Sequence, residues 1–274
     1  MADLEVVTAR LIDAIAREEA VTAVVPTFLL RQYLGANRDD LRDALGGALA
    51  GALECADREP SVIGRAAWLT LFVEATAVAD DERIRVAADR LLAGLQAEWP
   101  AQDRVADASA SVEACLRAAA LDDPGALIQR AIDHLEHVIG GSYRPGDGLM
   151  RDVNGIRVRC SAGDHAHAAS ALLTAFELTG RLPYAMLAEE LMLIARREPP
   201  AGVDTAIHCD AARVLCRLAS LHADPEYRAA AVIAADADYR ADASFMLAAQ
   251  SGCASGGTTA EAAAYGLALL DLLK

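Results

Sequence analysis

The chain has 274 residues and a formal net charge of −15, from 40 acidic and 25 basic side chains. This acidity argues against nucleic acid and anionic membranes as partners, because phosphates attract Lys and Arg. No uncharged apolar run is long enough to span a bilayer, and the charged start of the chain is unlike a secretory signal, so we expect a cytoplasmic protein. The length suffices for a substantial core, and we expect a single domain over residues 1–274.

Amphipathic helical patterns run through nearly the whole chain, with apolar residues at the 3.6-residue period. Aromatic residues make up only 4% of the chain, so small and branched apolar side chains must fill the core, as suits closely packed helices. After two initial helices, the patterns come mostly in pairs separated by short turn signals. The predicted helical segments are 3–20, 27–34, 39–56, 61–79, 81–98, 106–121, 124–139, a pair within 164–198, 204–222, 225–236, 242–250 and 258–273.

The pair within 164–198 is the clearest helical hairpin. Thr179 and Gly180 end its first helix, since glycine tolerates the left-handed conformation at a helix C-terminus. Pro183 opens the second helix, where a missing N–H has no consequence. Both helices carry an apolar stripe, so each predicts a buried face.

The helix pairs repeat along the chain. Apolar anchors in equivalent helices are separated by 43, 43, 57 and 43 residues, so one interval carries 14 extra residues. A repeat of this length indicates stacked helix pairs, each of which needs its neighbours to bury its apolar face. About six helical hairpins follow, and they fit an open superhelical array as well as a closed ring. The anchors are Leu41, Ile84, Leu127, Tyr184 and Tyr227.

The long interval contains a segment rich in glycine, residues 140–163. Within it, Asn154 and Gly155 stand between two short apolar runs, which is a strong signal for a β-hairpin. We therefore expect a short β-ribbon within 140–163, in a chain that is otherwise all-α.

The residues around the central hairpin resemble a known architecture. The pattern of this hairpin resembles that of the inner-helix hairpins of the six-hairpin toroids. It consists of Asp164, Ala166, the Ala-Leu-Leu run at 171–173, Glu177 and the Thr179-Gly180 pair. These (α/α)6 barrels include N-acylglucosamine 2-epimerases, unsaturated glucuronyl hydrolases and the toroid halves of certain thioredoxin-domain proteins. The segment 147–155 is similar to the β-ribbon that such toroids place between hairpins. The resemblance implies an (α/α)6-type toroid of six-hairpin glycosidase-like architecture. None of those enzymes' catalytic motifs is found, so no catalytic residue is carried over.

The repeat suggests a candidate site. His165 and His208 are 43 residues apart, so they occupy equivalent positions at the starts of neighbouring helices, and Arg65 stands at the corresponding place two units earlier. If these helices form an inner ring, the three side chains share one mouth of it. Paired histidines could then serve as acid and base in an epimerase-like reaction. The alternative is that both histidines are structural, partly buried near helix N-termini and bonded to loop carbonyls.

Further residues would complete such a site at the His165/His208 mouth. Asp164 and Asp210 lie beside the histidines, and the ribbon would bring Tyr143, Arg157 and Arg159 to the same mouth. An aspartate would orient an imidazole, and the arginines would hold an anionic group of a ligand. The predicted catalytic residues are thus His165 and His208, with the other side chains, Arg65 among them, binding the ligand.

Metal and cofactor sites are not expected. Asp164, His165, His208 and Cys209 include zinc-ligand types, but no HExxH, CxxC or similar spacing supports a metal. A glycine-rich run at 251–257 lacks a following lysine and a preceding strand, so it does not predict a phosphate loop. Six scattered cysteines indicate reduced thiols rather than a disulfide framework, and Cys55 and Cys115 are predicted to be buried.

Two functions remain open at this stage. The first is a toroid that binds or transforms a small polar, carbohydrate-like molecule, since a closed ring supplies a concave site. The second is a non-catalytic helical scaffold that binds a protein partner through its outer surface. A glycosidase would need two carboxylates across a sugar-sized cleft, and 40 acidic residues offer too many candidates to identify them. The sequence leaves open whether the chain is an enzyme.

Overall fold

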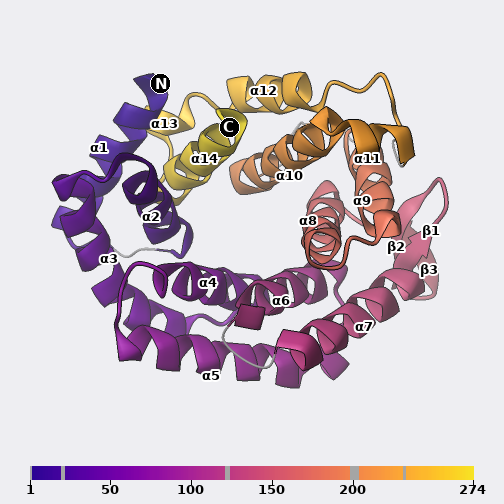
Figure 1. Cartoon of the computed structure of the whole chain (residues 1–274), viewed down its shortest axis with the longest axis horizontal. Coiled ribbons are helices and arrows are strands. Elements are labelled where there is room, and N and C mark those ends of the chain that lie inside the picture. The colour runs from indigo at the N-terminus through magenta and orange to yellow at the C-terminus, as the bar shows by residue number, and fades with distance from the viewer. Residues whose placement is uncertain (1, 20–21, 121–123, 198–203, 231–232) are drawn as a thin grey trace.

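Twelve helices form two concentric layers in the computed structural model, which describes residues 2–19, 22–120, 124–197, 204–230 and 233–274 (Figure 1). The inner layer comprises α2 (Val24–Ala36), α4 (Val62–Ala75), α6 (Val105–Arg117), α8 (Ala162–Thr179), α10 (Thr205–Ala223) and α14 (Thr259–Leu272). The outer layer comprises α1 (Ala2–Ala16), α3 (Asp39–Arg58), α5 (Glu82–Glu98), α7 (Pro124–Ser142), α9 (Leu182–Ala195) and α12 (Tyr239–Ala249).

The inner helices close into a ring. Each packs against the next in the order α2, α4, α6, α8, α10, α14, and α14 packs back against α2. The seam between α2 and α4 is the least extensively packed of the six. The chain therefore has the all-α (α/α)6 toroid fold, and the closed ring rather than the open array is the observed form (Figure 1). Within the described ranges, no helix is both long and apolar enough to cross a membrane.

Local signals set the ends of these helices. Ser161 and Asp164 form a reciprocal capping box at the start of α8, and Thr258 and Glu261 do the same for α14. Gly180 ends α8 with φ 67°, in the left-handed conformation that favours glycine. The predicted hairpin boundary there is confirmed, with Pro183 in the first turn of α9.

The core lies between the two helical layers. Alanine and leucine supply most of it, and the largest fully buried side chains include Trp68, Phe28 and Phe72. Small alanine side chains let the inner helices approach closely while the larger ones fill the space toward the outer layer. Cys115 is fully buried, as predicted, whereas Cys55 is only partly buried, because its helix face is turned further toward solvent than the apolar pattern indicated.

The predicted ribbon is confirmed as a three-stranded antiparallel sheet beside α7 and α9. Its strands are β1 (Tyr143–Arg144), β2 (Gly148–Val153) and β3 (Ile156–Arg159), in the order β1-β2-β3. Val153 pairs with Ile156, and the two residues between them, Asn154 and Gly155, both have positive φ, at 55° and 80°. Positive φ at both central residues is the geometry of the tight hairpin turn that Asn-Gly favours.

The helix predicted over 225–236 is shorter than expected. It appears as α11 (Pro225–Ala230), residues 231–232 lie outside the described part of the chain, and residues 233–238 are not helical. The backbone N–H groups of Ile233 and Ala234 donate instead to the carboxylate of Glu189, at 3.1 and 3.0 Å. Glu189 is fully buried on α9 and also accepts from Tyr239 Oη at 2.8 Å and contacts His222 Nε2 at 3.1 Å. These bonds replace helical ones, and α12 then takes the outer position against α10.

Two smaller differences concern helix ends and the glycine-rich run. The second helix extends over Val24–Ala36, beyond the predicted 27–34, because Val24 and Val25 continue its apolar face. The run at 251–257 contains one short helix, α13 (Cys253–Gly256), rather than only a turn. Two three-residue 3₁₀ segments, Trp99–Ala101 and Ala118–Ala120, follow α5 and α6. Position 121 of the helix predicted over 106–121 lies outside the described residues, as do 198–203, which include the end of the 164–198 hairpin.

Candidate functional site

A cavity of about 650 Å³ lies inside the ring of inner helices. Its wall is made mainly of alanine, threonine and charged residues, and of the described residues that line it only His167 carries an aromatic ring. Such a volume is that of a small-molecule pocket. The charged side chains in the wall are Arg31, Glu113, Arg117, Asp204, Asp210, Arg213, Arg217, Glu261 and Asp271.

The repeat explains why polar residues converge on this cavity. Residues at equivalent positions of successive inner helices lie 43 or 57 residues apart, and several of these equivalent pairs contact each other directly. One turn of the helices contributes a first ring of side chains, and the next turn contributes a second. The first ring is Thr27, Thr70, Glu113, Ser170 and Arg213, and the second is Arg31, Glu74, Arg117, Thr174 and Arg217.

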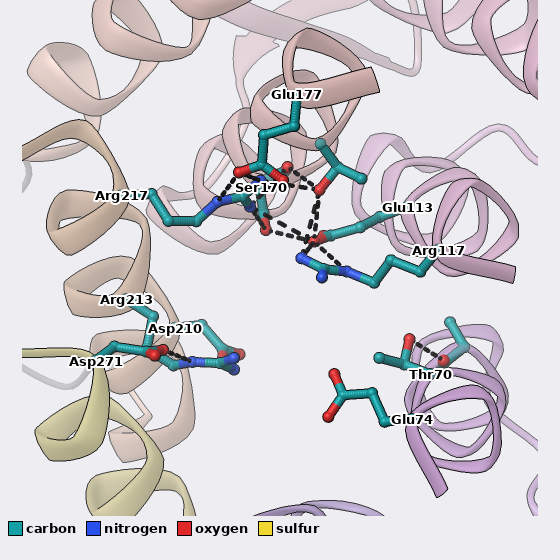
Figure 2. A network of polar contacts seen from close by, with 12 residues as sticks. Thr70, Glu74, Glu113, Arg117, Ser170, Glu177, Asp210, Arg213, Arg217 and Asp271 are labelled. Carbon is teal, nitrogen blue, oxygen red and sulfur yellow. Dashed lines mark hydrogen bonds and ion pairs between the residues drawn. The ribbon is translucent and has the colours of Figure 1, made fainter. Parts of the chain in front are cut away.

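Glu113 organises one side of the cavity (Figure 2). Its Oε1 accepts from Nε and Nη2 of Arg117 at 3.2 and 2.8 Å, and from the hydroxyls of Ser170 and Thr174 at 2.9 and 3.1 Å. Arg217 Nη1 lies 3.6 Å from the same oxygen. Thus α6, α8 and α10 are joined by one carboxylate, and two positive charges face it from different helices.

The charges around Glu113 fix its ionisation. Burial alone would raise the pKa of this carboxyl, but the charges of Arg117 and Arg217 outweigh burial and lower the pKa to about 2. Glu113 is therefore ionised throughout the neutral range. It holds the arginines in place and is unsuited to donate a proton near pH 7.

Arg217 binds residues of α8 on the same side of the cavity through all three of its side-chain nitrogens. It donates to the backbone carbonyl and the hydroxyl of Ser170, both at 3.0 Å, to the Thr174 hydroxyl at 3.0 Å, and to Glu177 at 2.9 Å. A guanidinium bonded in this way has a fixed orientation. Arg217 thus joins α10 to α8 and leaves the neighbouring Arg117 as the more accessible cation.

A second group of ion pairs lies across the cavity around Asp271. Arg213 Nε donates to Asp271 Oδ2 at 2.9 Å, and Arg31 Nη1 lies 3.8 Å from the other oxygen. Arg31 in turn forms a two-point pair with Glu74 across the α2–α4 seam, at 2.7 and 3.3 Å. Burial opposes ionisation of Asp271, but the charges and hydrogen bonds of Arg213 and Lys274 together outweigh burial and lower its pKa. These contacts join α10, α14, α2 and α4.

The two predicted catalytic histidines are buried and do not line the cavity. His165 Nε2 accepts from the backbone N–H of Leu149 at 3.1 Å, and Nδ1 lies 2.8 Å from the Ser161 carbonyl, so Nδ1 carries the proton. The ring ties the start of α8 to strand β2. His208 is 8% exposed, and its Nδ1 has no hydrogen-bond partner among the residues that the structure describes. For His165 this geometry matches the structural alternative, and a role in binding stays a prediction for both.

The other predicted site residues are dispersed. Asp164 is the capping residue of α8, and Arg65 forms a two-point pair with Glu98 on α5 at 2.6 and 2.6 Å. Arg157 is exposed on β3, opposite Asp152. Tyr143 Oη donates to Glu190, and Arg159 Nε donates to the Asp147 carbonyl. Asp210 lines the cavity, 3.6 Å from Arg213 Nη1.

Sequence reasoning missed Glu113, Arg117, Arg213 and Arg217. Their signal was present: charged residues recur at equivalent positions in the middle of helices, where the residues on either side of them are apolar. The repeat was used to predict which helix starts lie side by side. The wall of the central cavity also includes later turns of the inner helices, where these four residues lie. In the described part of the chain, no group of three His, Cys, Asp or Glu side chains is arranged to hold a metal ion.

Comparison with protein-family models and with curated proteins finds no match. Among solved structures, the chain is similar to the α-1,6-mannanase GH76A of Salegentibacter sp. HEL1_6, with 10% identity and a TM-score of 0.67, covering 91% of this chain and 87% of that one. Inactive variants of that enzyme in complex with α-1,6-mannotetrose and α-1,6-mannotriose give TM-scores of 0.66 and 0.64 at 11% and 10% identity, with the same coverage. At this identity the likeness establishes the shared six-hairpin toroid fold.

Proposed function

We propose that this protein binds a small, polar, carbohydrate-like molecule in the central cavity of its ring. The observation that carries the proposal is the cavity itself, about 650 Å³ in volume, with polar side chains from every inner helix in its wall. A ligand with several hydroxyl groups can both donate to the carboxylates and accept from the guanidiniums.

The structural neighbours support the same class of ligand. Two of them, which share this fold, are complexes with α-1,6-mannotetrose and α-1,6-mannotriose. In the present chain the wall offers no stacking platform beyond the imidazole of His167 among its described residues, so recognition would depend on hydrogen bonds to the edges of the ligand. This favours a small ligand enclosed by the ring over a long chain laid across aromatic rings.

The proposal concerns binding, without a hydrolytic reaction. The inactive mannanase variants carry substitutions of two consecutive aspartates, whereas the carboxylates that line this cavity are not consecutive in the sequence. Glycoside hydrolysis also needs a carboxylic acid that remains protonated near neutral pH. Glu113 and Asp271 have pKa values shifted in the opposite direction by their arginine partners.

The cavity favours ligand binding over the scaffold alternative, because a scaffold that acts through its outer surface does not need an open, polar cavity of about 650 Å³ inside the ring. Ala67 offers a direct test: it lines the cavity on α4 and is exposed there, so Ala67→Leu adds bulk to the cavity without disturbing a hydrogen bond. Ala93→Leu, on the exposed face of α5, is the matched control.

The experiment is a thermal-shift screen of mono- and oligosaccharides, followed by calorimetric titration of those that raise the melting temperature. We expect at least one sugar to stabilise the native protein and the Ala93→Leu variant, and the Ala67→Leu variant to lose that stabilisation. If Ala67→Leu binds the sugar as tightly as the native protein does, the ligand is bound elsewhere and the proposal is wrong.

A further inference from the structure

Four arginines line the cavity, and the three other than the fully bonded Arg217 come from alternate helices of the ring. Arg31 is on α2, Arg117 on α6 and Arg213 on α10, and each lines the cavity. In Figure 2, Arg117 and Arg213 extend from opposite walls toward the middle. In a chain with 40 acidic and 25 basic residues, this convergence of guanidinium groups is a feature of the site rather than of the composition.

Each of these arginines is held from one side by a carboxylate. Arg31 Nε and Nη2 bind Glu74, Arg117 Nε and Nη2 bind Glu113, and Arg213 Nε binds Asp271. The opposite edge of the guanidinium is less engaged. Within the described chain, Arg117 Nη1 and Arg213 Nη2 make no hydrogen bond, and Arg31 Nη1 has only the 3.8 Å approach to Asp271.

Arg117 and Arg213 are more accessible than the carboxylates that hold them, whereas Arg31 and Glu74 are about equally exposed. The Arg117 side chain is 31% exposed against 16% for Glu113, and that of Arg213 is 29% exposed against 16% for Asp271. Glu74 does not line the cavity, although its partner Arg31 does. Glu113 and Asp271 also line the cavity, but as the less exposed partners of their ion pairs. The wall therefore presents the unbonded N–H groups of Arg117 and Arg213 beside these carboxylates.

Arg31 and Arg213 share one carboxylate, and the charge of Arg213 also acts on Arg117. Arg213 and Arg31 approach the two oxygens of the same carboxylate, Asp271, at 2.9 and 3.8 Å. Burial opposes the charge of Arg117, and the nearby charge of Arg213 opposes it further, while Glu113 outweighs both and keeps the pKa of Arg117 raised. Two cations that repel each other across a cavity would both be stabilised by an anion placed between them.

We infer that Arg31, Arg117 and Arg213 form a site for an anionic group, a carboxylate or a phosphate, on the ligand of the central cavity. This inference rests on the proposed function and specifies the class of ligand. Guanidinium groups bind such anions by paired, charge-assisted hydrogen bonds, and groups fixed in advance by carboxylates need little reordering to do so.

Asp210 sets a further condition on this site. Its side chain is 45% exposed and lies 3.6 Å from Arg213 Nη1, so an incoming anion would share Arg213 with an existing negative charge. Removal of that charge by Asp210→Asn should therefore strengthen anion binding. Substitution of Arg117 or Arg213 should weaken it, so the two changes have opposite signs.

The test compares matched sugars by calorimetric titration at constant ionic strength: glucose, glucuronate and glucose 6-phosphate, together with inorganic phosphate alone. The proteins are the native chain, Asp210→Asn, Arg117→Gln, Arg213→Lys and a control, Arg58→Gln, whose side chain is 80% exposed on α3 and does not line the cavity. We expect at least one anionic sugar to bind at least tenfold more tightly than glucose, with phosphate competing. We expect Asp210→Asn to tighten anion binding severalfold, Arg117→Gln to weaken it at least tenfold, and Arg58→Gln to leave it unchanged.

The outcomes separate this inference from the proposed function. If glucose binds as tightly as both anionic sugars, the anion site is wrong while the proposed sugar binding stands. Anion binding that survives Arg117→Gln and Arg213→Lys unchanged would also overturn the assignment. Arg213→Lys keeps a positive charge beside Asp271, so this variant should fold. Asp210→Asn removes only a contact at 3.6 Å, so it should fold as well. These two variants decide the question if Arg117→Gln fails to fold. If no sugar, charged or neutral, binds the cavity, both proposals fail.

Discussion

Glu113→Gln should destabilise the protein substantially at neutral pH and much less in acid. In the native ring, the Glu113 carboxylate faces Arg117 and Arg217 and accepts from Ser170 and Thr174. Its pKa falls from an ordinary 4.5 to about 2, and each unit is worth 1.36 kcal/mol. The ionised carboxylate thus contributes roughly 3 kcal/mol to the free energy of unfolding, within the range for breaking one side of a buried ion pair.

The sign of the pH dependence follows from the lowered pKa. Because the folded-state pKa lies below the unfolded-state value, this stability is fully present above about pH 4.5 and is lost as the pH falls toward 2. The difference in unfolding free energy between native protein and Glu113→Gln should accordingly be about 3 kcal/mol at pH 7 and shrink steadily between pH 4.5 and pH 2.

Urea unfolding followed by circular dichroism, at a series of pH values, measures this difference directly. Glu54→Gln is the control, since the Glu54 carboxylate is 76% exposed and, within the described chain, pairs only with Arg58 on the surface, where an ion pair contributes little stability. A Glu113→Gln variant as stable as the control at pH 7, or a difference that stays constant down to pH 2, would refute the role assigned to Glu113.

Three further outcomes are expected. His165→Ala should lower the free energy of unfolding by ~1–3 kcal/mol, because the hydrogen bonds to Leu149 and Ser161 are lost, and should leave sugar binding intact. If His165 were functional, the variant would melt like the native protein but would not bind the sugar in a titration. Gly148→Ala should be destabilised by more than ~1 kcal/mol in the same assay, because φ is +80° and the added Cβ would lie 2.6 Å from His165 Nε2. Cys115 should resist thiol reagents in the native state, since burial raises its pKa to about 12, and labelling of Cys115 as fast as of an unfolded sample would contradict its buried position.

The fold was more predictable than the site because different kinds of information specify them. Gly180 and the Asn154-Gly155 pair act locally, through backbone conformations that few residues adopt, and both predicted boundaries are confirmed. The repeat interval could be read from apolar anchors alone. Ring closure depends on how α14 meets α2, which involves residues more than two hundred positions apart and leaves no local pattern.

The site needed information that the repeat supplied only in part. Equivalent positions correctly predict neighbours, as the contact of Arg31 with Glu74 illustrates, but they do not say which turn of a helix faces a cavity and which lies under a loop. His165 lies under the ribbon, where Gly148 leaves room for its ring, whereas Glu113 faces the interior. Likewise, the backbone N–H groups of Ile233 and Ala234 donate to Glu189 from a loop, although the sequence predicted a helix there. A tertiary contact therefore decides where α11 ends.

The thinly packed seam between α2 and α4 gives the ring a preferred place to open. Five of the six junctions between inner helices are packed extensively, while this one relies more on the two-point pair of Arg31 with Glu74 and on the bridging outer helix α3. Cooperative units of a protein open separately when the contacts between them are few. Backbone amides of α2 should therefore exchange with solvent through partial openings that leave α6, α8 and α10 intact. Such a transient gap between α2 and α4 would also let a ligand enter the cavity from the side. The gap should open more readily at high salt, because salt weakens the ion pair of Arg31 with Glu74 that closes it.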